Sequence, residues 1–253
     1  MKFRAVILDY PLKTIDQNPL VGQILGDVIR AKQVGFLQTE PNFVVMDKHD
    51  MIGTHFLIYD VENPFQPKLI LAIRNTYEER AKRHGVPLPI EGYIELGGPK
   101  AVTELSDIRR RFGPLVDCNS WFVNSEYTFK RTGLKLSEVG FLLVVNHILR
   151  RGQSHMVGAT NETYKASRWI REVGEFKEGL SFIHPTVPHP HCIALVDRFK
   201  FDFLERAMDQ YRGIVENAYE VLCPTEPIKP LEYAIERIKH ENMSQRQEVM
   251  LSA

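Results

Sequence analysis

Residues 117–174 carry two strand-and-helix patterns in succession, and a basic glycine turn joins the first strand to the first helix. The first strand is predicted at 118–123 (CNSWFV), and the turn at 130–135 (KRTGLK) leads into a helix with Ser137 as its N-cap. A second strand is predicted at 155–159 (HMVGA). A basic glycine turn that opens a helix suits a diphosphate, because backbone N–H groups and the positive end of the helix dipole point at the anion. The alternative is a solvated basic loop with an ordinary cap.

The same segment resembles the acyl-CoA-binding half of the GNAT acyltransferase superfamily, which places Gln/Arg-x-x-Gly-x-Gly/Ala between a strand and the following helix. Residues 130–135 keep the basic first position and the middle glycine, whereas Lys135 stands where the family has a small residue. The family's next landmark is a strand, an asparagine and a helix that ends in glycine, and it corresponds to 157–161 and Gly174. The resemblance assigns the following residues to the thioester donor: Phe122, Val123, Lys130, Arg131, Gly133, Lys135 and Asn161.

A second resemblance lies in residues 47–74. Asp47 and Asp50, the strand that follows them and a later strand that ends in Arg74 look like the acidic pair, strand and strand-plus-arginine of acyl-homoserine-lactone synthases and N-acyl amino acid synthases. Those enzymes have the GNAT fold and use acyl-ACP or acyl-CoA. The resemblance implies that Asp47, Asp50 and Arg74 support the amine substrate. From the residues alone, the two aspartates could equally form a turn between strands.

Acyl transfer to an amine sets simple chemical requirements. The amine must be neutral to attack a thioester, so a carboxylate or an ordered water must accept its proton. Asp117, Glu104 and Glu126 are the available carboxylates at strand ends, and Glu104 is favoured. The departing thiolate needs a donor, for which Tyr164 or Ser120 would serve. Cys118 lies on an apolar strand and is expected to be a packed thiol, so no covalent enzyme intermediate is predicted.

Alternation of helices and strands in the middle of the chain, framed by hairpins, indicates an α+β protein with a mixed α/β sheet. With the resemblance, this predicts a GNAT-like central, mostly antiparallel sheet with flanking helices. Residues 1–200 would form the acyltransferase domain, and residues 201–253 a helical C-terminal extension packed on it. Within the extension, 201–222 is predicted to be one long amphipathic helix, which covers the sheet or serves as a homodimer contact. Residues 75–98 are predicted to be a long loop.

Composition limits the partners of the chain. Among 253 residues, Lys+Arg and Asp+Glu are equal at 32 each, which argues against a nucleic-acid partner. No segment approaches the roughly 20 apolar residues of a membrane span. Three cysteines are too few for a disulfide scaffold, which predicts a reducing, cytoplasmic location.

The sequence and its resemblances together predict an N-acyltransferase that moves an acyl group from acyl-CoA or acyl-ACP to the amine of a small amino-acid-like acceptor. The acyl carrier protein would then be a partner, and no metal is needed. One alternative is a non-catalytic acyl-CoA-binding or regulatory module on the same fold. Another is a zinc hydrolase built on His184, His189 and His191, although their spacing matches no common metal pattern.

Overall fold

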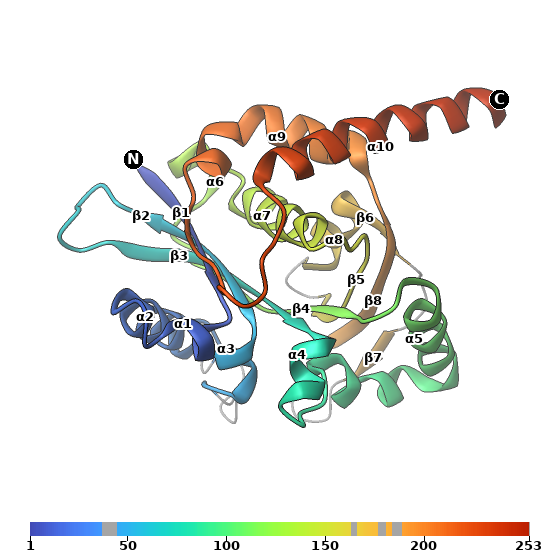
Figure 1. Ribbon diagram of the computed structural model, residues 1–253, viewed down its shortest axis with the longest axis horizontal. Helices are drawn as coiled ribbons and strands as arrows, with labels where there is room; N and C mark the ends of the chain where they lie inside the picture. The colour runs from blue at the N-terminus through green and yellow to red at the C-terminus, as the bar shows by residue number, and fades with distance from the viewer. Residues whose placement is uncertain (37–44, 163–165, 177–180, 184–188, 253) are drawn as a thin grey trace.

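The computed structural model describes residues 1–36, 45–162, 166–176, 181–183 and 189–252, and in them nine strands form a single sheet (Figure 1). The order across the sheet is β6-β8-β5-β4-β3-β2-β1-β9, with β7 beside β8. Neighbouring strands are antiparallel except for the pairs β4–β5 and β1–β9, which are parallel. The strands are β1 (Phe3–Asp9), β2 (Thr54–Asp60), β3 (Lys68–Tyr77), β4 (Val116–Val123), β5 (Met156–Asn161), β6 (Gly174–Phe176), β7 (Ser181–Ile183), β8 (Pro190–Phe199) and β9 (Tyr219–Val221). The predicted mixed, mostly antiparallel sheet is confirmed.

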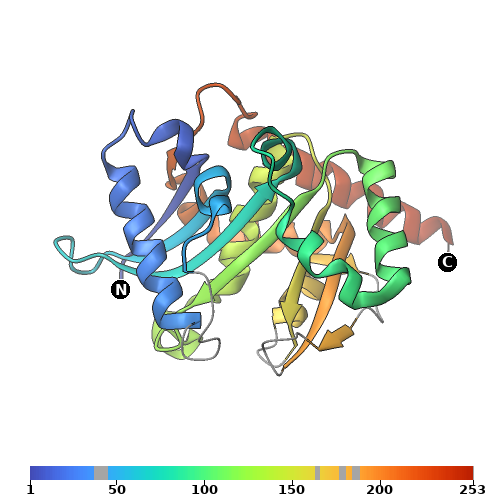
Figure 2. The same ribbon diagram turned by 90° about the horizontal axis from the view of Figure 1, so that it is seen from below.

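Helices cover both faces of this sheet. Figure 1 shows α7, α9 and α10 together on one face, and Figure 2 shows α2 and α5 on the opposite face, at its two ends. The α-helices are α1 (Pro11–Thr14), α2 (Leu20–Phe36), α3 (Lys48–Ile52), α4 (Glu78–Arg83), α5 (Gly98–Phe112), α6 (Phe129–Thr132), α7 (Leu136–Arg150), α8 (Ala166–Val173), α9 (Phe201–Glu216) and α10 (Leu231–Ser252). Two short 3-10 helices, η1 (Pro89–Gly92) and η2 (Ile94–Gly97), precede α5.

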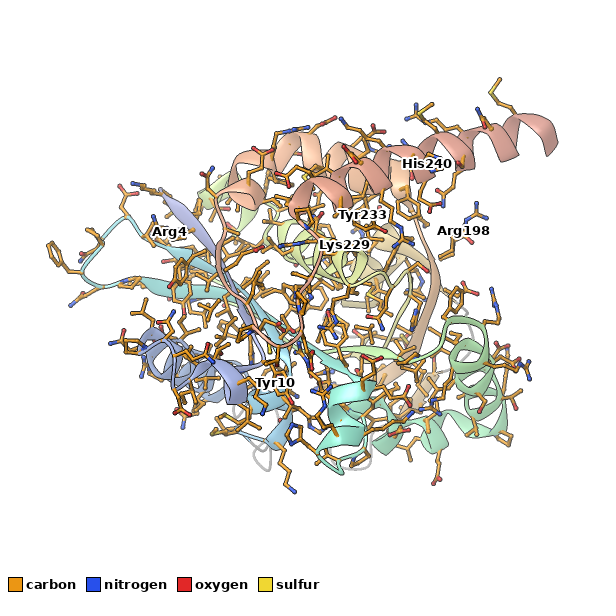
Figure 3. The ribbon with its side chains drawn as sticks, in the orientation of Figure 1. Arg4, Tyr10, Arg198, Lys229, Tyr233 and His240 are labelled. Carbon is orange, nitrogen blue, oxygen red and sulfur yellow. The ribbon has the colours of Figure 1, made fainter. Side chains whose placement is uncertain are left out.

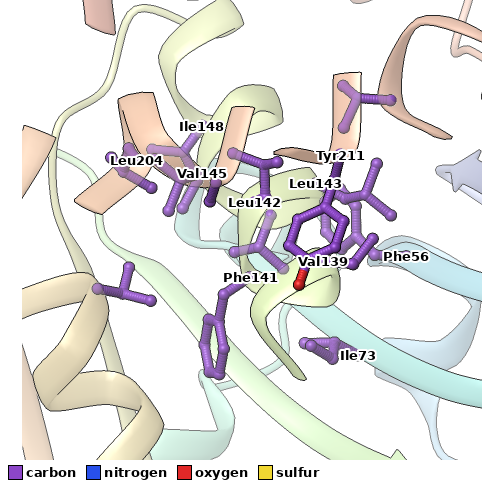
Figure 4. Packing of buried hydrophobic residues seen from close by; sticks show 14 of the residues in the cluster. Phe56, Ile73, Val139, Phe141, Leu142, Leu143, Val145, Ile148, Leu204 and Tyr211 are labelled. Atoms are coloured by element: carbon purple, nitrogen blue, oxygen red, sulfur yellow. The ribbon is translucent and has the colours of Figure 1, made fainter. Parts of the chain in front are cut away.

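The largest core lies between the sheet and α7. Side chains fill the space on both sides of the sheet (Figure 3), and on this side nearly every residue of α7 is buried, because α9 and α10 cover the helix from outside. Figure 4 shows Leu142, Leu143 and Val145 of α7 packed among Ile73 of β3 and Tyr211 of α9. Burying each such aliphatic side chain contributes about 1.5–3 kcal/mol to folding. The central position of α7 follows from its apolar surface on all sides.

The opposite face has two separate apolar clusters. Val21, Val28 and other residues of α2 pack on β1, β2 and β3, while Leu105 and Ile108 of α5 pack with Ile193 of β8. Between the two clusters lie the polar side chains of β3 and β4. The sheet therefore offers a polar strip at its centre, flanked by two helical covers.

At β4 the sheet is interrupted. Both strands are described along their whole length, yet β4 and β5 pair only at Asp117 and Val157, whereas β5 and β8 pair at six positions. In β4, Ser120 has a positive φ of 54° and belongs to a bulge, where two residues lie opposite Ile73 of β3. The edges of β4 and β5 beyond Asp117 are therefore not joined by the ladder.

Three local predictions were wrong. The helix predicted at 201–222 ends at Glu216, and β9 follows it and pairs with β1, so the C-terminal region adds a strand to the sheet as well as helices. The first helix after the basic turn begins at Leu136, which makes Ser137 its second residue rather than its N-cap. Residues 75–98 are largely structured, because β3 continues to Tyr77 and α4, η1 and η2 follow. These short elements are held by buried tertiary contacts, which a local sequence pattern does not reveal.

We expect Gly158→Ala to destabilise the protein. A Cβ at this position would lie 2.4 Å from the Cys118 carbonyl oxygen, a backbone atom that only a shift of β4 or β5 can move. The free energy of unfolding should fall by about 1–3 kcal/mol, the usual cost of overpacking. Urea denaturation measures it. Gly22→Ala is the matched control, since Gly22 is exposed in α2 with no atom within 4 Å of the added Cβ, and it should be neutral or stabilising. An equal loss in both variants would contradict the close approach at Gly158.

Candidate active site

A network of buried charges occupies the polar strip. Arg74 of β3 donates from Nη1 to Asp47 Oδ1 at 2.7 Å and to Asp50 Oδ1 at 2.6 Å, and from Nε to Asn119 Oδ1 of β4 at 2.7 Å. Lys32 of α2 donates to Asp50 Oδ1 at 2.5 Å. Asp47 caps α3 and forms a reciprocal capping box with Asp50, which fixes both carboxylates in front of Arg74. The network thus links α2, α3, β3 and β4.

Burial and pairing set the protonation of this network. Lys32, Asp50 and Arg74 expose only 3%, 1% and 4% of their side chains, whereas Asp47 exposes 34%. Burial alone would raise the pKa of Asp50, but Arg74 and Lys32 hold it below its ordinary value. Burial lowers the pKa of Lys32, and the Asp50 carboxylate opposes this. Two cations and two anions leave the network electrically balanced, which is how buried charges are tolerated.

Asp117 lies next to this network and at the point where β4 and β5 separate. Its side chain is 1% exposed, and burial raises its pKa to about 6. Its Oδ2 accepts from the Ile90 backbone N–H of η1 at 2.5 Å, and Asn119 Nδ2 lies 3.4 Å from its Oδ1. Asn119 also accepts from Arg74, so it connects Asp117 to the charged cluster. A carboxyl that titrates near neutrality in such a place is a candidate for proton transfer.

The structure places the residues assigned to the donor side around the outer part of β4 and the turn after it. Phe122 is buried against α2, Val123 lies at the exposed end of β4, and Asn161 is the last residue of β5. Lys130 and Arg131 are exposed on α6.

The amides around Gly133 are not free to form the expected cradle. The Gly133 N–H donates to Phe129 O at 2.8 Å and the Leu134 N–H to Thr132 Oγ1 at 3.0 Å. Gly133 has a φ of 70°, so the turn needs a glycine for its own geometry. The remaining backbone donors are those of the first turn of α7, which have no acceptor within the helix. Lys135 stands beside them and pairs with Glu138 at 3.1 Å.

Two of the residues predicted as catalytic, Ser120 and Glu104, lie on different elements. Ser120 lies in the bulge of β4, and its Oγ is buried. Glu104 is half-buried in the middle of α5, the helix that packs on β8, and is not a member of the charged cluster around Arg74. Tyr164 lies outside the described residues. Of the carboxylates considered from the sequence, Asp117 is the one that the structure joins to the cluster.

Two members of the site were missed in the sequence, Lys32 and Asn119. Lys32 follows Val21, Leu25 and Val28 on the apolar side of α2, and a lysine on a buried helix face was the available signal. Asn119 carried no signal, because its neighbours in the fold lie far away along the chain.

Known proteins resemble this chain in fold but not in sequence. No family model and no curated protein matches the sequence. A CoA-dependent acyl-homoserine lactone synthase, BjaI, solved with SAM and isopentyl-CoA, matches with a TM-score of 0.56 at 14% identity, over 93% of this chain and 99% of that chain. MesI, another CoA-dependent acyl-homoserine lactone synthase, matches with a TM-score of 0.51 at 13% identity, over 87% of this chain and all of that one. The chain has the fold of these synthases. The prediction that the chain shares its fold with acyl-homoserine-lactone synthases is confirmed.

The rival zinc site does not assemble in the part of the chain that the structure describes. Among those residues, no three His, Cys, Asp or Glu side chains are grouped as metal ligands, and His184 lies outside them. His191 Nδ1 lies 2.8 Å from the His189 carbonyl oxygen, and Cys192 is buried in β8. None of the described helices is long and apolar enough to cross a membrane.

We expect Asp50→Asn to destabilise the protein strongly and to change its response to acid. The variant leaves Lys32 and Arg74 buried with only Asp47 as an anionic partner, which should cost about 3–5 kcal/mol of unfolding free energy at pH 7. The pKa of Asp50 is lowered in the folded state. Its contribution is therefore present above the ordinary value of 3.8 and is lost as the pH falls below it.

Urea denaturation at pH 7 and at several values down to pH 3 checks both effects. The parent should lose more stability in acid than Asp50→Asn does. Asp16→Asn, on the exposed loop after α1, is the control and should match the parent at every pH. If the unfolding free energies of the parent and Asp50→Asn fell equally with pH, the stabilising role of ionised Asp50 would be contradicted.

Proposed function

We propose that the protein is an N-acyltransferase that moves an acyl group from an acyl-CoA or acyl-ACP thioester to the amine of a small amino-acid-like acceptor. The observation that carries the proposal is the separation of β4 from β5 directly beside Asp117, a buried carboxyl whose pKa lies near 6. The shared fold with CoA-dependent acyl-homoserine lactone synthases supports it.

The donor would enter between the separated strands. Backbone groups of β4 beyond Asp117 have no ladder partner on β5, so they can pair with the amides of a pantetheine arm as an added strand would. A small apolar cavity lies where β4, β5, β8 and α8 meet, and Cys118, Met156, Gly158 and Ile170 are among its lining residues. The diphosphate or phosphate would reach the first turn of α7, with Lys130 and Arg131 nearby in sequence.

The acceptor would bind on the side of the charged cluster. Asp47 is its most exposed member, and its carboxylate suits the ammonium group of an amino-acid-like acceptor. Arg74 holds Asp47 and Asp50 in place. His49 and Arg74 keep the pKa of Asp47 low, and Arg74 and Lys32 keep that of Asp50 low, so both carboxylates stay ionised while they bind a cation. Asp117 lies between this cluster and the separated strands, where the amine and the thioester would meet.

The reaction needs no covalent enzyme intermediate. Asp117, unprotonated above pH 6, takes a proton from the ammonium, and the neutral nitrogen attacks the thioester carbon. The C–N bond forms, the C–S bond breaks, and the thiolate leaves and takes up a proton to give amide and free thiol. Ser120 and Tyr164 are the proposed donors to the thiolate, with Glu104 as the alternative base. Cys118 is not used, because burial raises the pKa of its thiol and keeps it protonated.

Release of free thiol tests the proposal. The purified protein is mixed with acyl-CoA or acyl-ACP and a panel of amino acids and their derivatives, and thiol appearance is followed together with mass spectrometry of the amide. Acceptor-dependent thiol release with a matching amide supports the enzyme. Tight acyl-CoA binding without any amide would leave the non-catalytic module as the function.

Asp117→Asn should lower kcat by about 10²–10⁴, because the amide side chain cannot accept a proton. In the parent, kcat/KM should rise with pH through about 6 and then level off, since protonated Asp117 is inactive. The variant should lack this inflection. Glu104→Gln is the matched control, and it should stay close to the parent in both measurements. A large loss of kcat in Glu104→Gln alone would identify Glu104 of α5 as the general base.

A further inference from the structure

Two neighbouring side chains in the bulge of β4 carry buried polar atoms without a partner. Among the described residues, neither Ser120 Oγ nor Trp121 Nε1 has a hydrogen-bond partner, although both atoms are shielded from solvent. A buried donor left unpaired costs about 1–3 kcal/mol. An indole N–H can only donate, so the partner that would satisfy Trp121 is a hydrogen-bond acceptor.

The bulge explains why the indole faces the α7 side of the sheet. Asn119 contacts Arg74 on the polar strip, and Phe122 packs against α2 on that same face. Trp121 lies on the opposite face, against Phe141 of α7, with ring centroids 5.1 Å apart and planes at 79°. The extra residue of the bulge, Ser120, is what permits this placement between Asn119 and Phe122.

Trp121 is therefore close to where the donor would lie. It shares its face of β4 with Cys118, which lines the small apolar cavity where β4, β5, β8 and α8 meet. Packing against Phe141 holds the indole ring in one orientation, so its N–H is preorganised for a hydrogen bond to a ligand. Trp169 of α8 packs on the same core without a buried, unpartnered nitrogen in the described structure.

We propose that Trp121 Nε1–H donates a hydrogen bond to an amide carbonyl oxygen of the pantetheine arm. This rests on the proposed function and assigns part of its donor site to a side chain, in addition to the backbone of β4. A neutral donor in an apolar setting suits a neutral carbonyl better than a phosphate, which binds to charged or helix N-terminal groups. Trp121 is thus a binding residue for the pantetheine part of the donor.

Trp121→Phe tests this assignment, because phenylalanine keeps an aromatic ring against Phe141 and removes only the donor and the second ring. The Kd for CoA, measured by calorimetry, should rise roughly 5- to 30-fold. The KM for acyl-CoA should rise by a similar factor with kcat within about twofold. Without ligand, the variant should keep most of its thermal stability. Trp169→Phe is the matched control and should bind CoA as the parent does.

A second measurement does not depend on how the variant folds. In ¹⁵N-labelled Trp169→Phe protein, the one remaining indole N–H signal belongs to Trp121, and saturating CoA should move it downfield. If CoA did not move the signal, or if Trp121→Phe bound CoA as tightly as the parent, the role of Trp121 would be wrong. Acceptor-dependent thiol release by the parent would still support the acyltransferase. If the parent bound no CoA and no pantetheine-bearing carrier, both the assignment and the donor half of the proposed function would fail. If a water molecule rather than CoA accepted the Trp121 hydrogen bond, the indole signal would not change on addition of CoA, and the proposal would be wrong.

Discussion

The separation of β4 from β5 is the constraint on which the rest of the molecule depends. An ordinary parallel pair would continue its ladder beyond Asp117, and the middle of the sheet would then be closed to any ligand. Here the bulge at Ser120 turns β4, and Gly158 lets the chain of β5 pass against the Cys118 carbonyl where a side chain would clash. Each departure would be costly alone in a sheet interior. Together they end the ladder between the two strands beside Asp117, although Gly158 and the Cys118 carbonyl stay in close contact.

The charged cluster explains how this interruption of the sheet coexists with a stable fold. A strip of polar residues in the centre of a sheet loses the hydrophobic stabilisation that α2 and α5 gain on either side. Arg74 offsets this by joining β3 to Asp47 and Asp50 of α3 and to Asn119 of β4. The position of Asp117 then follows, because Asn119 and the Ile90 amide hold its two oxygens. Stability and the candidate chemistry are carried by the same contacts.

Local patterns in the sequence predicted the elements well where periodicity was strong and poorly where tertiary contacts decide. The strands near 118–123 and 155–159, the helix after the basic turn, and the nearness of Asp47, Asp50 and Arg74 could all be read from residues and resemblance. The preference for Glu104 over Asp117 could not be tested in that way, because burial and the Ile90 amide set the properties of Asp117, and neither leaves a local trace. The amides of Gly133 and Leu134 show the same limit, since a glycine turn that closes on itself has the same sequence as one that receives an anion.

The C-terminal region shows how far such tertiary contacts reach. Arg80 of α4 is fully buried, pairs with Asp9 at 2.8 Å and lies 4.4 Å from the centre of the Tyr10 ring. Its second carboxylate is Glu226, from the segment between β9 and α10, which also accepts from Arg83 and Arg151. Arg80 also donates to Ile52 O at the end of α3, the helix that presents Asp50. A residue that follows the last strand thus helps to neutralise a buried cation that supports the candidate acceptor side.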